Sequence, residues 1–233
     1  MTRNRVLLLV TLLLSAPAVW CADAGGAPVQ NESLAYNINW PSGLSLGEAR
    51  VISHFVNDHW YFEMVLDAGV PGFAVSDRFS SIAGNDLCSL EFGRETLHGK
   101  RRTQEKTTFD YKKKVAHRVT LNGGGKNDSK LTGCARDALS FVILARRELG
   151  LGRVPSAQTV YYGSQYTVKM DFAGPRNITY NDKKAKADKA TVTVKGPASD
   201  FSFEIYFALD AARTPLVVKV PLSVGMISAE LVR

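Results

Sequence analysis

Short stretches in which apolar and polar residues alternate recur along most of the 233-residue chain. In three of the clearest, the apolar side chains fall on one face: YNINW (36–40), WYFEMVL (60–66) and FSFEIYF (201–207). A period of two over such lengths is typical of a half-buried β-strand. Turn signals such as Pro71-Gly72 and Gly196-Pro197 separate these stretches. We count about ten to twelve strands and predict a mainly β fold, a curled antiparallel sheet that forms a half-barrel or barrel.

One segment, DALSFVILARRELG, departs from this alternation and predicts an apolar α-helix over residues 137–149. Asp137 is suited to cap its amino end, and Arg146 and Arg147 suit the negative carboxyl end. Gly150 is expected to end the helix in a left-handed conformation. Apolar residues cover more of this helix than a single stripe. We therefore expect it to lie against or inside the concave face of the sheet.

The amino terminus has the parts of a secretory signal. Arg3 and Arg5 precede an unbroken apolar run from Val6 to Leu14, and small residues follow. The run is too short to cross a bilayer about 30 Å thick. We expect cleavage after Ala24, with a cut after Cys21 as the weaker alternative.

This interpretation divides the chain into a signal peptide (1–24), a flexible leader (25–33) and a single β-rich domain (34–233). We expect no lipid anchor at Cys21, because the preceding Trp20 is too large for lipoprotein processing. No other apolar run approaches 18 residues, so we predict no transmembrane helix in the mature chain.

Removal of the signal leaves two cysteines, Cys88 and Cys134. Two is the number that one disulfide requires, and an exported protein meets an oxidising environment. We predict a disulfide between them, with two free buried thiols as the alternative. Neither lies in a CxxC pair or beside a histidine, which gives a redox or nucleophilic role little support.

The formal net charge is +7, and basic residues gather in three places: 100–102, 112–114 and 183–189. They are interpreted either as solvated strand ends and turns or as a patch for an acidic surface such as anionic lipid or polysaccharide. Export removes the protein from nucleic acid, so we expect no nucleic-acid partner.

No motif predicts a catalytic residue, a metal site or a cofactor. The stretch Gly123-Gly124-Gly125-Lys126 lacks the earlier glycine and the following Ser or Thr of a phosphate-binding loop. His54 and His59 are five residues apart, which on a strand places their rings on opposite faces, so a shared metal would need a turn at Asn57-Asp58.

The order of several short motifs resembles that of a bacterial exported family, domain of unknown function 3108. The motifs are an early YxIxW strand with Gly43-Leu44-x-x-Gly47, the helix entry Cys134-x-x-Asp137-Ala138-Leu139-Ser140 with Arg146-Arg147, and a carboxyl-terminal strand-turn-strand with Phe203 to Asp210, Arg213, Thr214, Pro215 and Gly225. The resemblance covers nearly all of the mature chain. It implies a periplasmic protein of a Gram-negative-type envelope with a curled antiparallel sheet and a helix, similar in outline to lipoprotein-carrier half-barrels. It implies no enzyme activity and no catalytic residues.

These observations favour a non-enzymatic binding or carrier module whose sheet and helix enclose an apolar ligand such as an acyl chain. A continuous apolar cavity of about 300 Å³ or more would favour this hypothesis, and a packed interior would favour an envelope scaffold that holds a protein partner through a sheet edge or the basic patches. An enzyme is the third hypothesis. The candidate cavity-lining residues are Trp40, Trp60, Phe62, Phe141, Ile143, Phe203 and Ile205.

Overall fold

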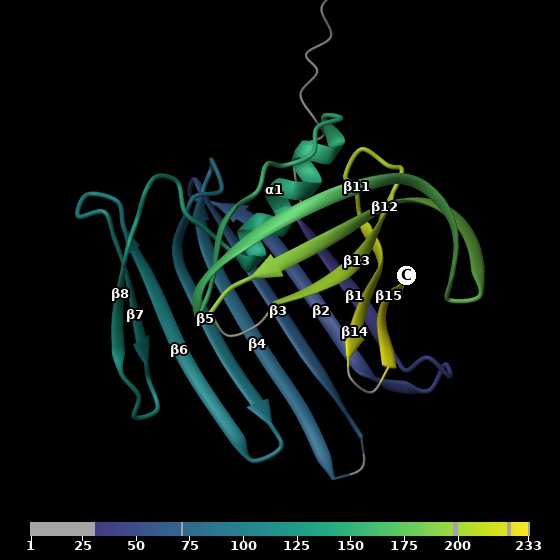
Figure 1. Cartoon of the computed structure of the whole chain (residues 1–233), viewed down its shortest axis with the longest axis horizontal. Helices are drawn as coiled ribbons and strands as arrows, with labels where there is room; N and C mark the ends of the chain where they lie inside the picture. The colour runs from purple at the N-terminus through teal and green to yellow at the C-terminus, as the bar shows by residue number, and fades with distance from the viewer. Residues whose placement is uncertain (1–30, 71, 198–199, 223–224, 233) are drawn as a thin grey trace, which may run out of the picture.

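The computed structural model describes residues 31–70, 72–197, 200–222 and 225–232 (Figure 1). The predicted signal peptide, including Cys21, lies outside the described residues, as does the predicted leader up to residue 30. The first strand begins at Glu32, so it includes Glu32 and Ser33, which the sequence assigned to the leader.

The described residues form fifteen strands and one helix. The strands are β1 (Glu32–Asn39), β2 (Ser45–Val56), β3 (His59–Val70), β4 (Phe73–Gly84), β5 (Ser89–His98), β6 (Arg101–Asp110), β7 (Val115–Thr120), β8 (Lys126–Lys130), β9 (Arg136–Asp137), β10 (Gln158–Tyr162), β11 (Ser164–Tyr180), β12 (Lys183–Lys195), β13 (Asp200–Ala208), β14 (Pro215–Leu222) and β15 (Gly225–Val232). The predicted mainly β class is confirmed, but the predicted number of strands was too low. Strands such as β8, which has no apolar residue, and β9, which has two residues, show no apolar–polar alternation.

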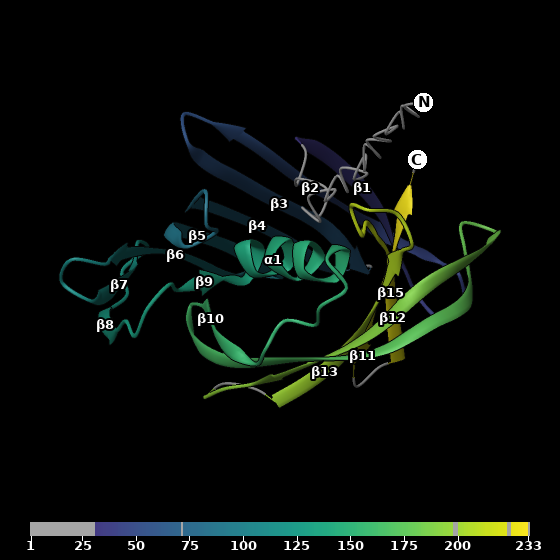
Figure 2. The same ribbon diagram turned by 90° about the horizontal axis from the view of Figure 1, so that it is seen from above.

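All fifteen strands belong to one sheet, in the order β8-β7-β6-β5-β4-β3-β2-β1-β15-β14-β13-β12-β11-β10-β9. Neighbours along the sheet are antiparallel, except for β9 and β10. The pairing of β1 with β15 joins the two halves, and β8 and β9 form the two edges. The sheet curls strongly without closing, as expected from the cumulative twist of many strands, and encloses a concave space (Figure 2).

The helix α1 (Ala138–Gly150) lies on the concave side and contacts β3, β4, β9 and β10 (Figure 2). Asp137 caps its amino end as predicted, and its carboxylate accepts hydrogen bonds from the backbone N–H groups of Leu139 and Ser140. The predicted stop at Gly150 is wrong. Gly150 is helical because the N–H of the next residue, Leu151, still bonds to carbonyl groups of the preceding turn, and the left-handed residue is Gly152, with φ of 73°. No helix in the described part of the chain has the length and apolarity to span a membrane.

Aromatic side chains bring β10 into contact with the far half of the sheet. Tyr161 packs edge-on against Phe109 of β6, with the ring centres 5.1 Å apart. Tyr162 packs against Phe79 of β4 and Phe92 of β5, at 5.5 and 6.2 Å. Side-chain packing therefore holds the curl in the region where β10 faces the inner side of β4 to β6.

A disulfide and a buried carboxylate fix the amino end of α1. We call this group the helix anchor, and it consists of Ser81, Cys88, Ser89, Cys134 and Asp137. The predicted disulfide is confirmed, with the Cα atoms of Cys88 and Cys134 5.0 Å apart. The Asp137 carboxylate accepts hydrogen bonds from the hydroxyls of Ser81 (2.6 Å) and Ser89 (2.5 Å). Burial raises the pKa of Asp137, and these hydrogen bonds oppose the shift.

Candidate ligand cavity

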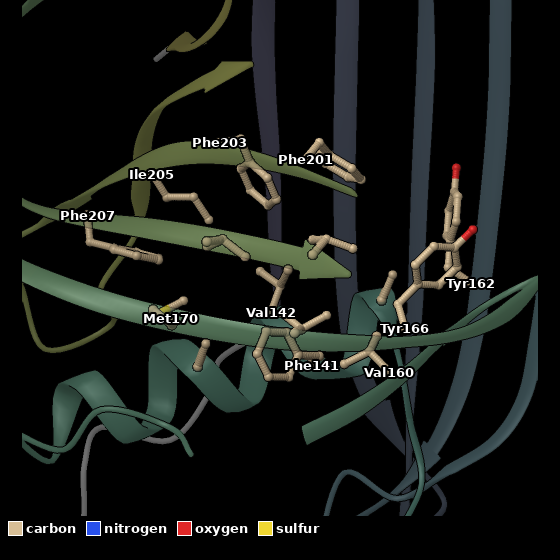
Figure 3. A pocket seen from close by; sticks show the side chains of 15 residues that line it. Phe141, Val142, Val160, Tyr162, Tyr166, Met170, Phe201, Phe203, Ile205 and Phe207 are labelled. Carbon is tan, nitrogen blue, oxygen red and sulfur yellow. The ribbon is translucent and has the colours of Figure 1, made fainter. Parts of the chain in front are cut away.

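A first apolar cavity, cavity 1, lies between α1 and strands β10 to β13 and has a volume of about 270 Å³. Side chains from the helix and from the strands meet in this space (Figure 3). Its lining residues are Ala138, Phe141, Val142, Ala145, Val160, Tyr162, Tyr166, Val168, Met170, Val192, Val194, Phe201, Phe203, Ile205 and Phe207. Two tyrosines are the sole source of polar side-chain atoms in this lining.

A second apolar cavity, cavity 2, lies on the other side of the helix, over strands β1 to β3 and β13 to β15. Its volume is about 400 Å³. Its lining residues are Leu34, Tyr36, Ile38, Ala49, Val51, Phe62, Met64, Leu66, Leu139, Val142, Ile143, Arg146, Phe203, Ile205, Pro215, Val218, Val220, Ile227 and Ala229. Alternate residues of most of these strands face it, as the pleat of a half-buried sheet requires.

Three side chains belong to both linings: Val142 of α1, and Phe203 and Ile205 of β13. The two cavities are therefore neighbours that share a thin apolar wall. Val142 is 37% exposed although it belongs to both linings. The protein therefore leaves part of the Val142 side chain uncovered at the wall between the two cavities.

The polar groups of cavity 2 are already hydrogen-bonded within the protein. The Tyr36 hydroxyl donates to the carbonyl oxygen of Pro215 at 3.0 Å, and burial raises the pKa of this tyrosine. Both terminal nitrogens of Arg146 pair with the Glu32 carboxylate, and its Nε donates to the carbonyl oxygen of Ala212 at 3.1 Å. Because few groups remain to bind a polar molecule, this lining suits an apolar ligand.

One end of cavity 1 is polar. The hydroxyl groups of Tyr162 and Tyr166 point away from the phenylalanine side chains (Figure 3). Burial raises the pKa of Tyr162, and the nearby Arg94 opposes that shift. The Arg94 guanidinium carbon lies 5.0 Å from the centre of the Tyr162 ring, within the range of a cation–π contact. The apolar space thus ends at two tyrosine rings, one of which, Tyr162, contacts a cation.

Most of the residues predicted to line a cavity do so. Phe141, Phe203 and Ile205 line cavity 1. Phe62 and Ile143 line cavity 2, together with Phe203 and Ile205.

The two predicted tryptophans line neither cavity. Trp60 is buried between Phe55 and Phe62, with ring centres at 4.9 and 5.8 Å, because it lies near the β2–β3 turn, where side chains pack closely. Trp40 follows the end of β1 and is partly buried. Val142, which borders both cavities, was not among the predicted lining residues, although it belongs to the apolar segment of the helix.

One group of three potential metal ligands occurs among the described residues, formed by Asp86, Cys88 and Cys134, whose ligand atoms lie within 4.8 Å of one another. Both sulfur atoms belong to the disulfide, so they cannot act as thiolate ligands. His54 and His59 lie on either side of the two-residue turn at Asn57-Asp58. The His54 ring stacks on Tyr61 at 5.2 Å, and Nδ1 of His59 lies 2.7 Å from the carbonyl oxygen of Asn57.

The three basic clusters lie at three different hairpins. Residues 100–102 occupy the β5–β6 hairpin, 112–114 the β6–β7 turn, and 183–189 follow the β11–β12 turn. Some of these charges are neutralised locally: Arg102 pairs with Glu95, and Lys189 pairs with Glu204. The β11–β12 turn lies on the other side of the molecule from β6 and β7, which separates the third cluster from the first two (Figures 1 and 2).

Comparison with curated proteins finds no match. A family model, in contrast, matches almost the entire described domain, from residue 35 to residue 232. The matched range begins within β1 and ends within β15, the two strands that pair where the halves of the sheet meet. The chain therefore belongs to the family described as "Protein of unknown function (DUF3108)".

Proposed function

We propose that this protein is an exported, non-enzymatic binding or carrier module for an apolar or lipid-like ligand such as an acyl chain, acting in the periplasm. The observation that carries the proposal is the pair of adjoining apolar cavities beneath α1, about 270 and about 400 Å³ in volume. Binding sites for small molecules usually occupy about 300 to 1,000 Å³ and are lined mainly by apolar and aromatic side chains.

The energetics favour a flexible apolar chain. Each buried methylene group contributes about 0.8 kcal/mol, so a chain of about ten carbons offers about 8 kcal/mol before the cost of association. Several residues that line cavity 2 stay partly exposed, including Leu34, Val51 and Leu66. A ligand would bury this surface without disturbing the packed core.

Two features support export. The amino-terminal sequence has the three parts of a secretion signal. The two cysteines of the domain form a disulfide, a bond that is typical of proteins in oxidising compartments. Neither feature depends on the nature of the ligand.

A second candidate function is that of an envelope scaffold. From Lys169 to Tyr180, β11 pairs with β12 on one side, and its other side pairs with no strand among the described residues. Such an edge can accept a strand from a partner protein. The bulge between Phe172 and Gly174 and the charges of Lys169, Asp171 and Arg176 interrupt this edge, as in strands protected against pairing. We therefore place the carrier function first.

The test is binding of a fluorescent fatty-acid probe to the mature protein, together with native mass spectrometry of protein purified from its own host's envelope. We expect a probe complex and a co-purifying lipid.

Val142→Trp would fill the wall region of both cavities and should weaken probe binding at least tenfold. Val154→Trp is the matched control, because Val154 is exposed in the loop after α1 and lines neither cavity. Equal binding by the two variants, or no binding by the wild type, would rule out the carrier function and favour the scaffold.

A further inference from the structure

Three charged residues lie on the inner face of the sheet, next to the tyrosine end of cavity 1. Arg94 of β5 has the same orientation as the buried Phe92, two residues earlier, and Glu105 of β6 is itself buried. Arg118 of β7 has the orientation of the buried Ala116. The strands β5, β6 and β7 are adjacent, so the three side chains form one cluster.

This cluster carries more positive than negative charge. Arg94 Nη2 donates to Glu105 Oε2 at 2.7 Å, and Arg118 Nη1 lies 3.6 Å from Glu105 Oε1. The single Glu105 carboxylate thus pairs with two guanidinium groups, which leaves one positive charge unbalanced within the cluster. The nearest acid on β4, Asp77, forms a pair with His98 at 2.9 Å and has no ion pair with either arginine.

Both arginines keep unused hydrogen-bonding capacity. The buried Nε–H groups of Arg94 and Arg118 have no hydrogen-bond partner among the described residues. Their side chains as a whole remain 21% and 29% exposed. Arg146 in cavity 2 differs, because it is 4% exposed and all its nitrogens are engaged by Glu32 and Ala212.

The β10–β11 turn connects the cluster to the cavity. Tyr162 lines cavity 1, and its ring contacts Arg94. The carbonyl oxygen of Gly163 accepts a hydrogen bond from Arg118. Gly163 adopts φ of 70°, and a Cβ at this position would lie 2.8 Å from Glu105 Oε2 and 2.9 Å from Arg94 Nη2. The turn therefore packs directly on the ion pair, which keeps the charged groups beside the end of the apolar space.

We propose that Arg94 and Arg118 form a subsite for the anionic headgroup of a single-chain amphiphile whose hydrocarbon chain occupies cavity 1. This inference rests on the proposed carrier function and specifies its ligand. A guanidinium group presents paired N–H donors that match a carboxylate or a phosphate, and such charge-assisted bonds are stronger in a partly desolvated site. The neighbouring tyrosine hydroxyls would face the junction between headgroup and chain.

The test compares dodecanoic acid, dodecyl phosphate and dodecanol, which share one chain length, by calorimetry at neutral pH. Charge-assisted hydrogen bonds contribute about 1.5 to 3 kcal/mol, so we expect both anions to bind at least about tenfold more tightly than the alcohol. Arg94→Gln/Arg118→Gln should remove this preference and leave the affinity for dodecanol unchanged. Arg118→Gln alone, a milder change at the more exposed arginine, should reduce the preference. Arg78→Gln is the matched control, because Arg78 lies on the outer face of β4, paired with Glu63.

The outcomes separate the two proposals. If none of the three compounds binds, the carrier function itself is wrong. If the alcohol binds as tightly as the anions, or if Arg94→Gln/Arg118→Gln keeps the preference while still binding dodecanol, the headgroup subsite is wrong and the carrier function stands. The two anions also distinguish a carboxylate from a phosphate headgroup. Inorganic phosphate that binds as tightly as dodecyl phosphate would show a free-anion site and overturn the proposal of an amphiphile.

Discussion

The amino end of α1 and its middle lie little more than one helical turn apart, yet they are held in opposite ways. At the amino end, the Asp137 carboxylate is fully buried, receives four hydrogen bonds and lies beside the disulfide. In the middle, Val142 lines two cavities and is more than a third exposed. The amino end of the helix is therefore fixed by a buried polar group, whereas its middle borders the two cavities.

This difference shows how a hollow domain keeps a defined shape. A cavity lowers stability because its lining side chains lack packing partners. The helix anchor acts in the opposite direction, because its bonds fix the position of α1 without filling the concave space. We therefore expect substitutions in the helix anchor to change folding, and substitutions over the cavities to change binding.

The largest loss of stability should follow Asp137→Ala. This change removes the helix cap, worth about 0.5 to 2 kcal/mol, and leaves buried donors unsatisfied at about 1 to 3 kcal/mol each. We expect the free energy of unfolding in urea to fall by about 4 kcal/mol or more. Asp137→Asn keeps an acceptor for the helix N–H groups and should lose less. Equal losses in the two variants would contradict the role assigned to the cap.

The same position predicts a pH dependence. Burial raises the pKa of Asp137 in the folded protein above its value of about 3.9 in the unfolded chain. The folded state therefore keeps the proton to higher pH, and its stability falls as the pH rises from about 4 through the folded pKa. We expect the stability of the wild type relative to Asp137→Asn to decrease over this range. A relative stability that instead increases with pH would mean that the four hydrogen bonds outweigh the cost of burial.

The next largest effect should come from the disulfide. Cys88 and Cys134 are 46 positions apart, and a loop of this size is worth about 4 kcal/mol on the chain-entropy model. We expect Cys88→Ser/Cys134→Ser to lose about 2 to 4 kcal/mol of unfolding free energy. Probe binding at low temperature, where the variant is still folded, should persist because neither cysteine lines cavity 1 or cavity 2. If probe affinity instead fell in proportion to stability, the cavities would depend on the helix anchor for their shape, and the proposed separation of folding from binding would be wrong.

A fourth prediction compares packed and hollow positions on α1. Leu144 is buried in the core and lines neither cavity, so Leu144→Ala should cost about 2 to 5 kcal/mol. Val142→Ala should cost about 1 kcal/mol or less, because the side chain is partly exposed. Val217→Ala is the control with matched chemistry, since Val217 is fully buried and lines neither cavity. In urea unfolding, Val217→Ala should lose clearly more unfolding free energy than Val142→Ala. Equal losses would mean that the space beneath Val142 is filled.

Local features of the fold could be predicted from the sequence, whereas features set by tertiary contacts could not. Residues close in the sequence determine the apolar–polar alternation around Tyr36 and Phe203. The same holds for the helix cap at Asp137. The end of the helix depends on which backbone groups remain bonded, so Gly150 alone did not determine it. The strand β8 owes its place to pairing with β7, and its own residues carry no apolar signal.

The same distinction applies to the candidate site. Apolar–polar alternation correctly predicted that Phe203 and Ile205 face the inner side of the sheet. Alternation does not show where along a strand the packed core ends and a cavity begins. Trp60, which lies in the packed core, was therefore wrongly predicted to line the cavity. Arg94 and Glu105 were missed because charged residues are usually expected to face solvent. Arg94 is two residues from Phe92, and Glu105 is four residues from Phe109. Because side chains alternate between the two faces of a strand, these even spacings could have placed both charged residues on the inner face.

The most specific effect on binding should follow Phe203→Ala. Phe203 is partly buried and forms part of the wall between the two cavities, with its ring centre 5.9 Å from that of Phe201. Its removal should cost less than the about 3 to 5 kcal/mol of a fully packed phenylalanine, because its neighbours already border empty space. The enlarged space should then accept longer chains.

In a series of fatty acids from ten to eighteen carbons, we expect the chain that Phe203→Ala binds most tightly to be longer than the one that the wild type binds most tightly. Phe172→Ala should keep the wild-type preference, because Phe172 is exposed and lines neither cavity. An unchanged preference with a full core penalty would show that the chain does not cross the wall at Phe203, and a ligand would then be confined to one cavity.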